Sequence, residues 1–115
     1  MKTNDIAGRA LVDSRMRNLQ WMLLSKIKRG ETLRMEGFDR SLMALLEKRA
    51  AEIEENPGMV PTSVTDWMAM ALFAENRRDF AIMCGQAEKA NDSAYRQAAV
   101  WLNRLMKKAE DADSR

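Results

Sequence analysis

Apolar residues in the first thirty positions recur at helical spacing, and they lie on two faces. With about 3.6 residues per turn, these positions form two separate stripes along one helix. Polar residues suited to an N-cap come first, and Gly30 is a typical helix end, so the pattern predicts a helix from about residue 4 to residue 29. A helix that is apolar on two faces needs two partners. One stripe contains Val12, Met16, Leu19, Leu23 and Ile27, and the other contains Ala7, Leu11, Met22 and the flank of Trp21.

A second helix is predicted from about Asp39 to Glu55, with only one apolar face. The short connection over residues 31–37 implies that the first two helices form an antiparallel hairpin over residues 4–55. The expected buried face consists of Phe38, Leu42, Leu45, Leu46 and Ile53, widened by Met43 and Ala50. The expected solvent face consists of Asp39, Glu47, Lys48, Glu52 and Glu55.

Residues 56–63, NPGMVPTS, form the strongest break in the pattern and hold both prolines of the chain. Ser63 and Asp66 have the spacing of a capping box, which predicts that a third helix starts at Val64. Residues 75–79 predict a corner between the third and fourth helices. Residues 91–93 predict a further break, with a cap for the fifth helix. The third helix is expected to bury Val64, Trp67, Met68 and Ala71 on one side and Met70 and Phe73 on another. In the fourth helix, helical spacing places four apolar residues in register along one face: Phe80, Met83, Ala87 and Ala90. The fifth helix is expected to bury Ala98, Leu102, Leu105, Met106 and Ala109.

The predicted fold is therefore a single all-α domain of about five helices over residues 1–115. It comprises the hairpin over residues 4–55, the linker over 56–63, three shorter helices over 64–110 and a frayed tail over 111–115. The scarcity of glycine (5) and proline (2) supports helix throughout.

Composition argues against an enzyme, a cofactor and a metal site. The chain has no histidine, which removes the commonest general base and the commonest metal ligand. Its one cysteine, Cys84, lies in the apolar run FAIMCG and is expected to be buried and unreactive. No uncharged apolar run reaches about 18 residues, so no membrane span and no membrane partner are expected. We expect a cytoplasmic protein.

Charge is unevenly distributed, although the net charge is only +2. Residues 1–30 hold seven Lys and Arg against two acidic residues, a net charge of +5, and residues 31–56 hold four against seven, a net charge of −3. The basic segment can therefore meet either the acidic helix that follows it or a nucleic acid. The candidate nucleic-acid contacts are Arg15, Lys26, Lys28 and Arg29, together with Arg96, Arg104 and Lys107 on the solvent face of the last helix.

Residues 86–105 weakly resemble a helix-turn-helix DNA-binding motif. Ala90, Ala94 and Val100 fall near its small and apolar positions, and a basic helix face follows the turn. Lys89 and Ser93 depart from the motif, where apolar residues are usual. The favoured interpretation is a capped helix with a solvated basic face.

The pattern as a whole favours a small non-enzymatic helical protein that acts by contact with another protein, as an adaptor, assembly or regulatory factor. The alternative is a DNA- or RNA-binding regulator that uses a basic helix face. If the second helix covers one stripe of the first, Leu11, Trp21 and Met22 remain uncovered. Either the last three helices fold over these residues or a second chain does, and we expect a homodimer with its interface there.

Overall fold

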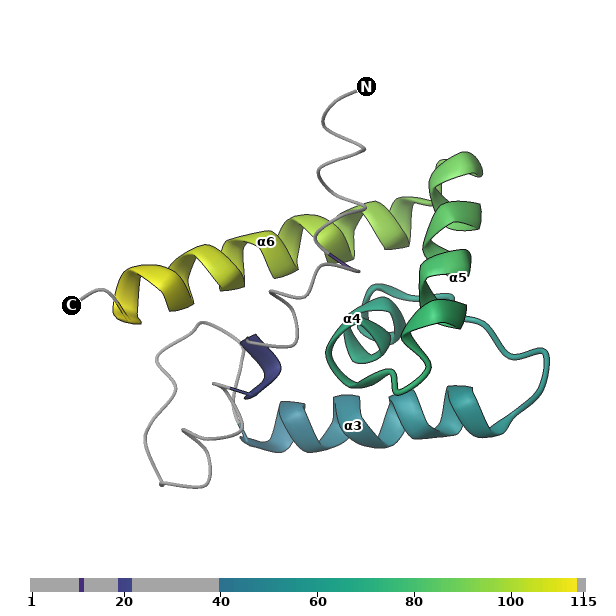
Figure 1. Cartoon of the computed structure of the whole chain (residues 1–115), viewed down its shortest axis with the longest axis horizontal. Coiled ribbons are helices and arrows are strands. Elements are labelled where there is room, and N and C mark those ends of the chain that lie inside the picture. The colour runs from purple at the N-terminus through teal and green to yellow at the C-terminus, as the bar shows by residue number, and fades with distance from the viewer. Residues whose placement is uncertain (1–10, 12–18, 22–39, 114–115) are drawn as a thin grey trace.

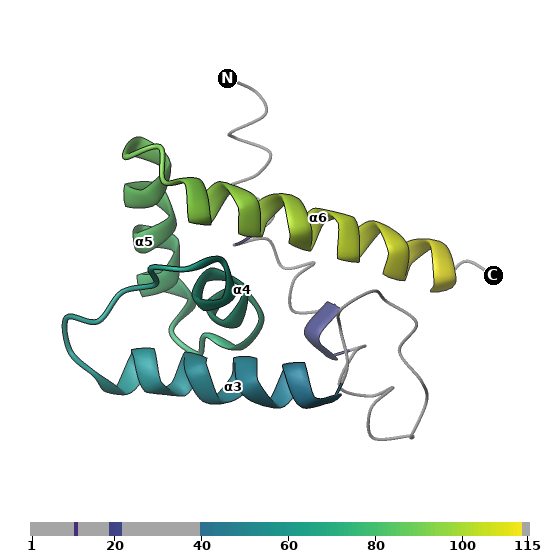
Figure 2. The same cartoon turned by 180° about the vertical axis from the view of Figure 1, so that it is seen from behind.

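The computed structural model describes residue 11, residues 19–21 and residues 40–113, and all the regular structure in these ranges is helical. The helices with assigned bounds are α3 (Arg40–Glu55), α4 (Val64–Phe73), α5 (Arg77–Lys89) and α6 (Ser93–Asp113). In both views α4 lies between α3 and α6, and α5 runs transverse to α6 (Figure 1 and Figure 2). The predicted all-α class is confirmed for this part of the chain. The predicted first helix and the loop over residues 31–37 lie outside the described residues, except for residues 11 and 19–21.

Helix α3 has almost the predicted bounds, but its buried face is rotated from the predicted one. Met43, Leu46, Ala50 and Ile53 are buried, with the alternating spacing of three and four residues that forms a helical stripe. Leu45 was expected in this stripe and is instead 62% exposed. At about 100° per residue, Leu45 lies about 200° from Met43, on the opposite side of the helix. The prediction for Leu45 was wrong. Met43 and Ala50, which were expected only to widen the buried face, are part of the buried stripe, so Leu45 faces the other way.

The start of α4 follows the predicted capping box only in part. The Ser63 hydroxyl accepts a hydrogen bond from the Asp66 backbone N–H at 3.1 Å, as predicted. The Asp66 carboxylate accepts hydrogen bonds from the Thr62 N–H at 3.2 Å and from Arg49 Nε of α3 at 2.8 Å. The cap of α4 is therefore tied to α3 by a charge-assisted hydrogen bond.

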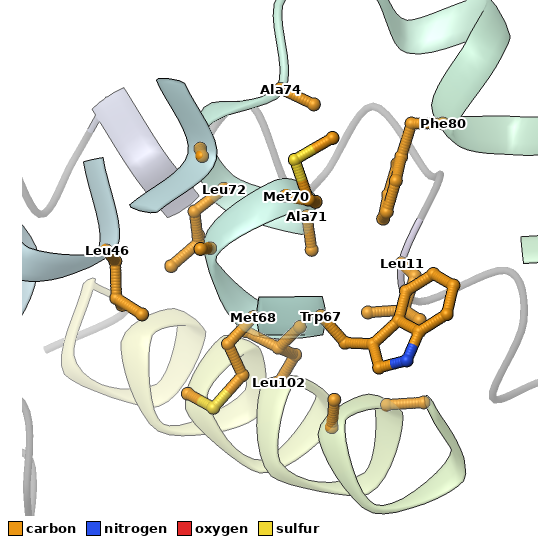
Figure 3. Packing of buried hydrophobic residues seen from close by; sticks show 14 of the residues in the cluster. Leu11, Leu46, Trp67, Met68, Met70, Ala71, Leu72, Ala74, Phe80 and Leu102 are labelled. Carbon is orange, nitrogen blue, oxygen red and sulfur yellow. The ribbon is translucent and has the colours of Figure 1, made fainter. Parts of the chain in front are cut away.

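Helix α4 is buried on all sides, and the other helices are arranged around it. Every residue from Asp66 to Leu72 is buried. Figure 3 shows Leu46 of α3, Phe80 of α5 and Leu102 of α6 around α4. The Trp67 ring lies 5.1 Å from the Tyr95 ring of α6 in a T-shaped contact and 6.1 Å from the Phe80 ring, measured between centroids. A helix with no polar face needs partners on every side, which explains its central position.

The turns on either side of α5 confirm the predicted breaks. Asn76 caps the start of α5, where its side chain accepts from the Asp79 N–H at 3.0 Å. Asn91 adopts a φ of 57°, a left-handed conformation that asparagine tolerates better than most residues. Asp92 then caps α6 by accepting from the N–H groups of Ala94 and Tyr95. Helix α6 continues through Asp113, beyond its predicted end at residue 110.

Arg77 joins three parts of the core at the C-terminal end of α4. Its Nη1 donates to the carbonyl of Ala71 at 2.8 Å, and its Nη2 donates to the carbonyl of Leu11 at 3.1 Å. The last carbonyls of a helix have no partner within the helix, so a guanidinium supplies the missing donors. The same group lies 5.2 Å from the centre of the Phe80 ring. Arg77 thereby attaches residue 11 to the α4–α5 corner.

The first prediction concerns Asp66. The hydrogen bond from Arg49 holds the pKa of the Asp66 carboxyl below its usual range. Stability from this carboxylate is therefore present above the pKa of the unfolded chain and is lost as pH falls through the lower folded pKa. We expect Asp66→Asn to lower the free energy of unfolding by about 1.5–3 kcal/mol at neutral pH, and the difference from wild type to shrink in acid. Urea unfolding at a series of pH values measures this.

Glu52→Gln is the matched control, because Glu52 approaches Arg49 at 3.7 Å on the exposed surface of α3. An exposed pair contributes about 0–1 kcal/mol, so this variant should remain close to wild type. Equal stability of Asp66→Asn and wild type at neutral pH would contradict the role assigned to Asp66.

The second prediction concerns a buried hydroxyl. Within the part of the chain that the structure describes, the Tyr95 hydroxyl and the Trp67 Nε1 are buried without a hydrogen-bond partner. Burial also raises the pKa of Tyr95. Because an unpaired buried polar group carries an uncompensated desolvation cost, Tyr95→Phe should raise the free energy of unfolding by about 1 kcal/mol. Thermal or urea unfolding measures this, and a loss of stability in Tyr95→Phe would show that the hydroxyl has a partner.

Candidate interaction surfaces

The one cysteine of the chain lies in the core. Cys84 is buried in the core, and this burial raises the pKa of its thiol to about 12. A thiol with so high a pKa is almost entirely protonated at neutral pH and is a poor nucleophile. Among the described residues, no group of three or more Cys, Asp and Glu side chains is placed to hold a metal ion. The function is therefore sought on the surface.

An acidic groove of about 640 Å³ lies between residue 20, the outer part of α3 and the α4–α5 corner. Among the residues that the structure describes, four carboxylates line it and no Lys or Arg does. Its other lining residues include Phe73, which is half-buried. We define the acidic groove by Gln20, Glu47, Ala51, Glu54, Glu55, Phe73 and Glu75.

One of these carboxylates also has a structural role. Glu54 accepts hydrogen bonds from the backbone N–H groups of Glu75 at 3.1 Å and Asn76 at 3.0 Å. Glu54 thereby fixes the α4–α5 corner to α3 and forms the wall of the groove. The sequence analysis assigned the glutamates of α3 only to a solvated face. Their neighbours in the groove come from distant segments, so helical spacing alone could not reveal the groove.

Trp21 directly follows Gln20, a lining residue of the acidic groove, and its side chain is 73% exposed. Trp67, by contrast, is only 3% exposed. Of the three residues predicted at an interface, Met22 lies outside the described residues. Leu11 is completely buried within this chain's own core (Figure 3), so the same chain covers it.

A second surface lies on the outer side of α6. Arg96, Arg104 and Lys107 are exposed there, as the pattern predicted. Val100 and Trp101 lie among them and are 45% and 41% exposed. The basic residues predicted near the N-terminus, Arg15, Lys26, Lys28 and Arg29, lie outside the described residues. We define the α6 outer face by Arg96, Gln97, Val100, Trp101, Arg104 and Lys107.

No protein-family model matches this sequence, and no curated protein or solved structure is significantly similar to it. None of the helices that the structure describes has the length and apolar character needed to cross a membrane. Functional inference therefore depends on the chemistry of the two surfaces.

The third prediction concerns Cys84. Because the thiol pKa is raised from 9.0 to about 12, its thiolate fraction at mildly alkaline pH is about a thousandfold below that of an ordinary cysteine. We expect a disulfide reagent to label the native protein correspondingly slowly and the denatured protein at the normal rate. A colorimetric thiol assay measures both. Fast labelling of the native protein would contradict the buried, protonated state.

Proposed function

We propose that this protein is non-enzymatic and acts by contact with another protein, and that a second copy of the chain is one such partner. The observation that carries the proposal is Trp21, a tryptophan that is 73% exposed beside a groove lined with carboxylates. A tryptophan ring exposed to water is energetically unfavourable, and tryptophans are among the residues that contribute most to the binding free energy of protein interfaces.

The charge around Trp21 supports self-association. The acidic groove is lined by Glu47, Glu54, Glu55 and Glu75, whereas residues 1–30, which include Trp21, carry a net charge of +5. A two-fold dimer brings the same surface of both copies together, so each basic segment can meet the partner's acidic groove. Trp21 then becomes buried near the centre of the contact, where aromatic anchors are most effective.

The alternative function is nucleic-acid binding, with the protein acting as a DNA- or RNA-binding regulator. The α6 outer face favours it, because three exposed cations and an exposed tryptophan lie on the same helix there. This alternative uses a surface other than the acidic groove. The two functions can therefore be tested by separate variants.

The fourth prediction is that the wild-type protein is a dimer at micromolar concentrations and that Trp21→Glu is a folded monomer. The substitution removes the aromatic anchor and adds a carboxylate beside a groove that is already acidic. Analytical ultracentrifugation gives the mass of each variant. Because opposite charges across the contact are screened by salt, the wild-type dimer should also weaken as ionic strength rises.

Ile82→Glu is the matched control, since Ile82 is another large exposed apolar residue, 55% exposed and on α5. It introduces the same charge on a different helix and should leave the dimer intact. A wild-type protein that stays monomeric from micromolar to millimolar concentrations would refute the dimer. A dimer that persists in Trp21→Glu would show that the interface lies elsewhere.

A further inference from the structure

The α6 outer face combines positive charge with an exposed aromatic ring. At about 3.6 residues per turn, its six residues span an arc of about 140° along about 16 Å of helix. The sequence from Ser93 to Lys107 contains no acidic residue, so no carboxylate of α6 neutralises these cations over this length. Between Ser93 and Lys107 this face of α6 therefore carries three cations and no carboxylate, and Asp92 and Asp111 lie about one turn beyond its two ends.

The cation nearest the start of α6 is held in place. Arg96 Nη1 donates to the side-chain oxygen of Asn91 at 2.6 Å, which ties the guanidinium to the α5–α6 turn. A guanidinium has five N–H donors, so most of them remain available to an anionic partner. Arg104 and Lys107 continue the positive charge toward the C-terminal end. Such a row can follow successive anionic groups of an extended ligand.

Trp101 adds a different kind of contact. It is 41% exposed, with Val100 beside it at 45% exposure, and it lies at one edge of the face, between Arg96 and Arg104 along the helix axis. An exposed aromatic ring can stack against any nucleobase, and flanking cations bind the phosphates on either side of that base. Gln97, also exposed, supplies a side chain that can both donate and accept hydrogen bonds.

The opposite side of the molecule is richer in carboxylates. Helix α3 exposes Glu47, Glu52, Glu54 and Glu55 beside the cations Lys48 and Arg49, and α4 separates it from α6 (Figure 1 and Figure 2). An anionic polymer therefore meets more negative charge on α3 than on the α6 outer face. This charge separation favours one orientation of the protein on a phosphate backbone.

We infer that the α6 outer face binds single-stranded nucleic acid. The cations match its phosphates, and Trp101 matches an unpaired base. Bases of a duplex are stacked on one another and have no free face for Trp101, so a single strand fits this surface better than a duplex. The interaction does not depend on the self-association proposed above, because Trp21 and the acidic groove are not part of the α6 outer face.

The fifth prediction is that the full chain binds a labelled poly-dT strand, as measured by fluorescence anisotropy. With three phosphate contacts, counterion release weakens binding about 20-fold between about 50 and about 200 mM salt. Replacing Arg96, Arg104 and Lys107 together by Gln should abolish binding at the higher salt concentration and flatten the salt dependence. Trp101→Ala should weaken binding about tenfold through loss of stacking, whereas Trp101→Phe should retain most of the affinity.

The matched control replaces Lys48, Arg78 and Lys89 by Gln. These are exposed cations of α3 and α5, and the net charge changes by the same amount. This control and Trp21→Glu should both bind normally, and circular dichroism should show every variant folded. Absence of binding at low salt, or equal loss in the control, would overturn the inference. The inference would also be overturned if poly-dT binding were lost only in the Lys26/Lys28/Arg29→Ala variant. Tighter binding to duplex DNA than to poly-dT, or equal affinity for polyglutamate and poly-dT, would overturn it as well.

Discussion

The central constraint on this structure is that α4 has no side it can expose to water. After Asp66, the helix reads WMAMALF, without a polar side chain, and its middle residues are fully buried. Helices α3 and α6 pack against it, Phe80 of α5 reaches it, and Leu11 completes the cluster. Each large side chain buried in this way contributes about 1.5–3 kcal/mol, so the arrangement of the other elements follows from covering α4. The unpaired Trp67 Nε1 and Tyr95 hydroxyl are a cost of filling that core with large aromatic rings.

The polar groups at the two ends of this buried helix make hydrogen bonds with charged side chains from other parts of the chain. At the N-terminal end, Asp66 receives hydrogen bonds from Arg49 and Thr62. At the C-terminal end, Arg77 donates to carbonyls of α4 and Glu54 accepts from the corner that follows. Burying a polar group without such a partner costs several kcal/mol, so Asp66 and Arg77 serve the fold, whereas Glu54 both holds the α4–α5 corner and lines the acidic groove. The charged residues available for function are therefore those of the outer faces.

The features that could be predicted from the sequence are the ones that neighbouring residues determine. The Ser63 cap, the break at residues 91–93 with its cap, and the exposed cations of α6 all depend on residues within one or two turns. The features that could not be predicted depend on contacts between distant segments. The rotation that exposes Leu45 is set by how α3 meets α4, and the acidic groove needs residue 20, α3 and the α4–α5 corner together. For Leu11, helical spacing indicated an apolar side chain that must be buried. It could not indicate whether the same chain or a second chain buries it.

Residues on the outer faces of the described helices are not needed to bury α4. Their composition is therefore informative about function. Trp101 is 41% exposed on the outer face of α6, where lysine and glutamine have higher helix propensity than tryptophan. Large apolar side chains in water also favour unwanted association. The same reasoning applies to Trp21, which remains 73% exposed while Trp67 fills the core. Burial in the core accounts for Trp67, whereas the exposure of Trp21 and Trp101 is what the proposed contacts with other molecules would explain.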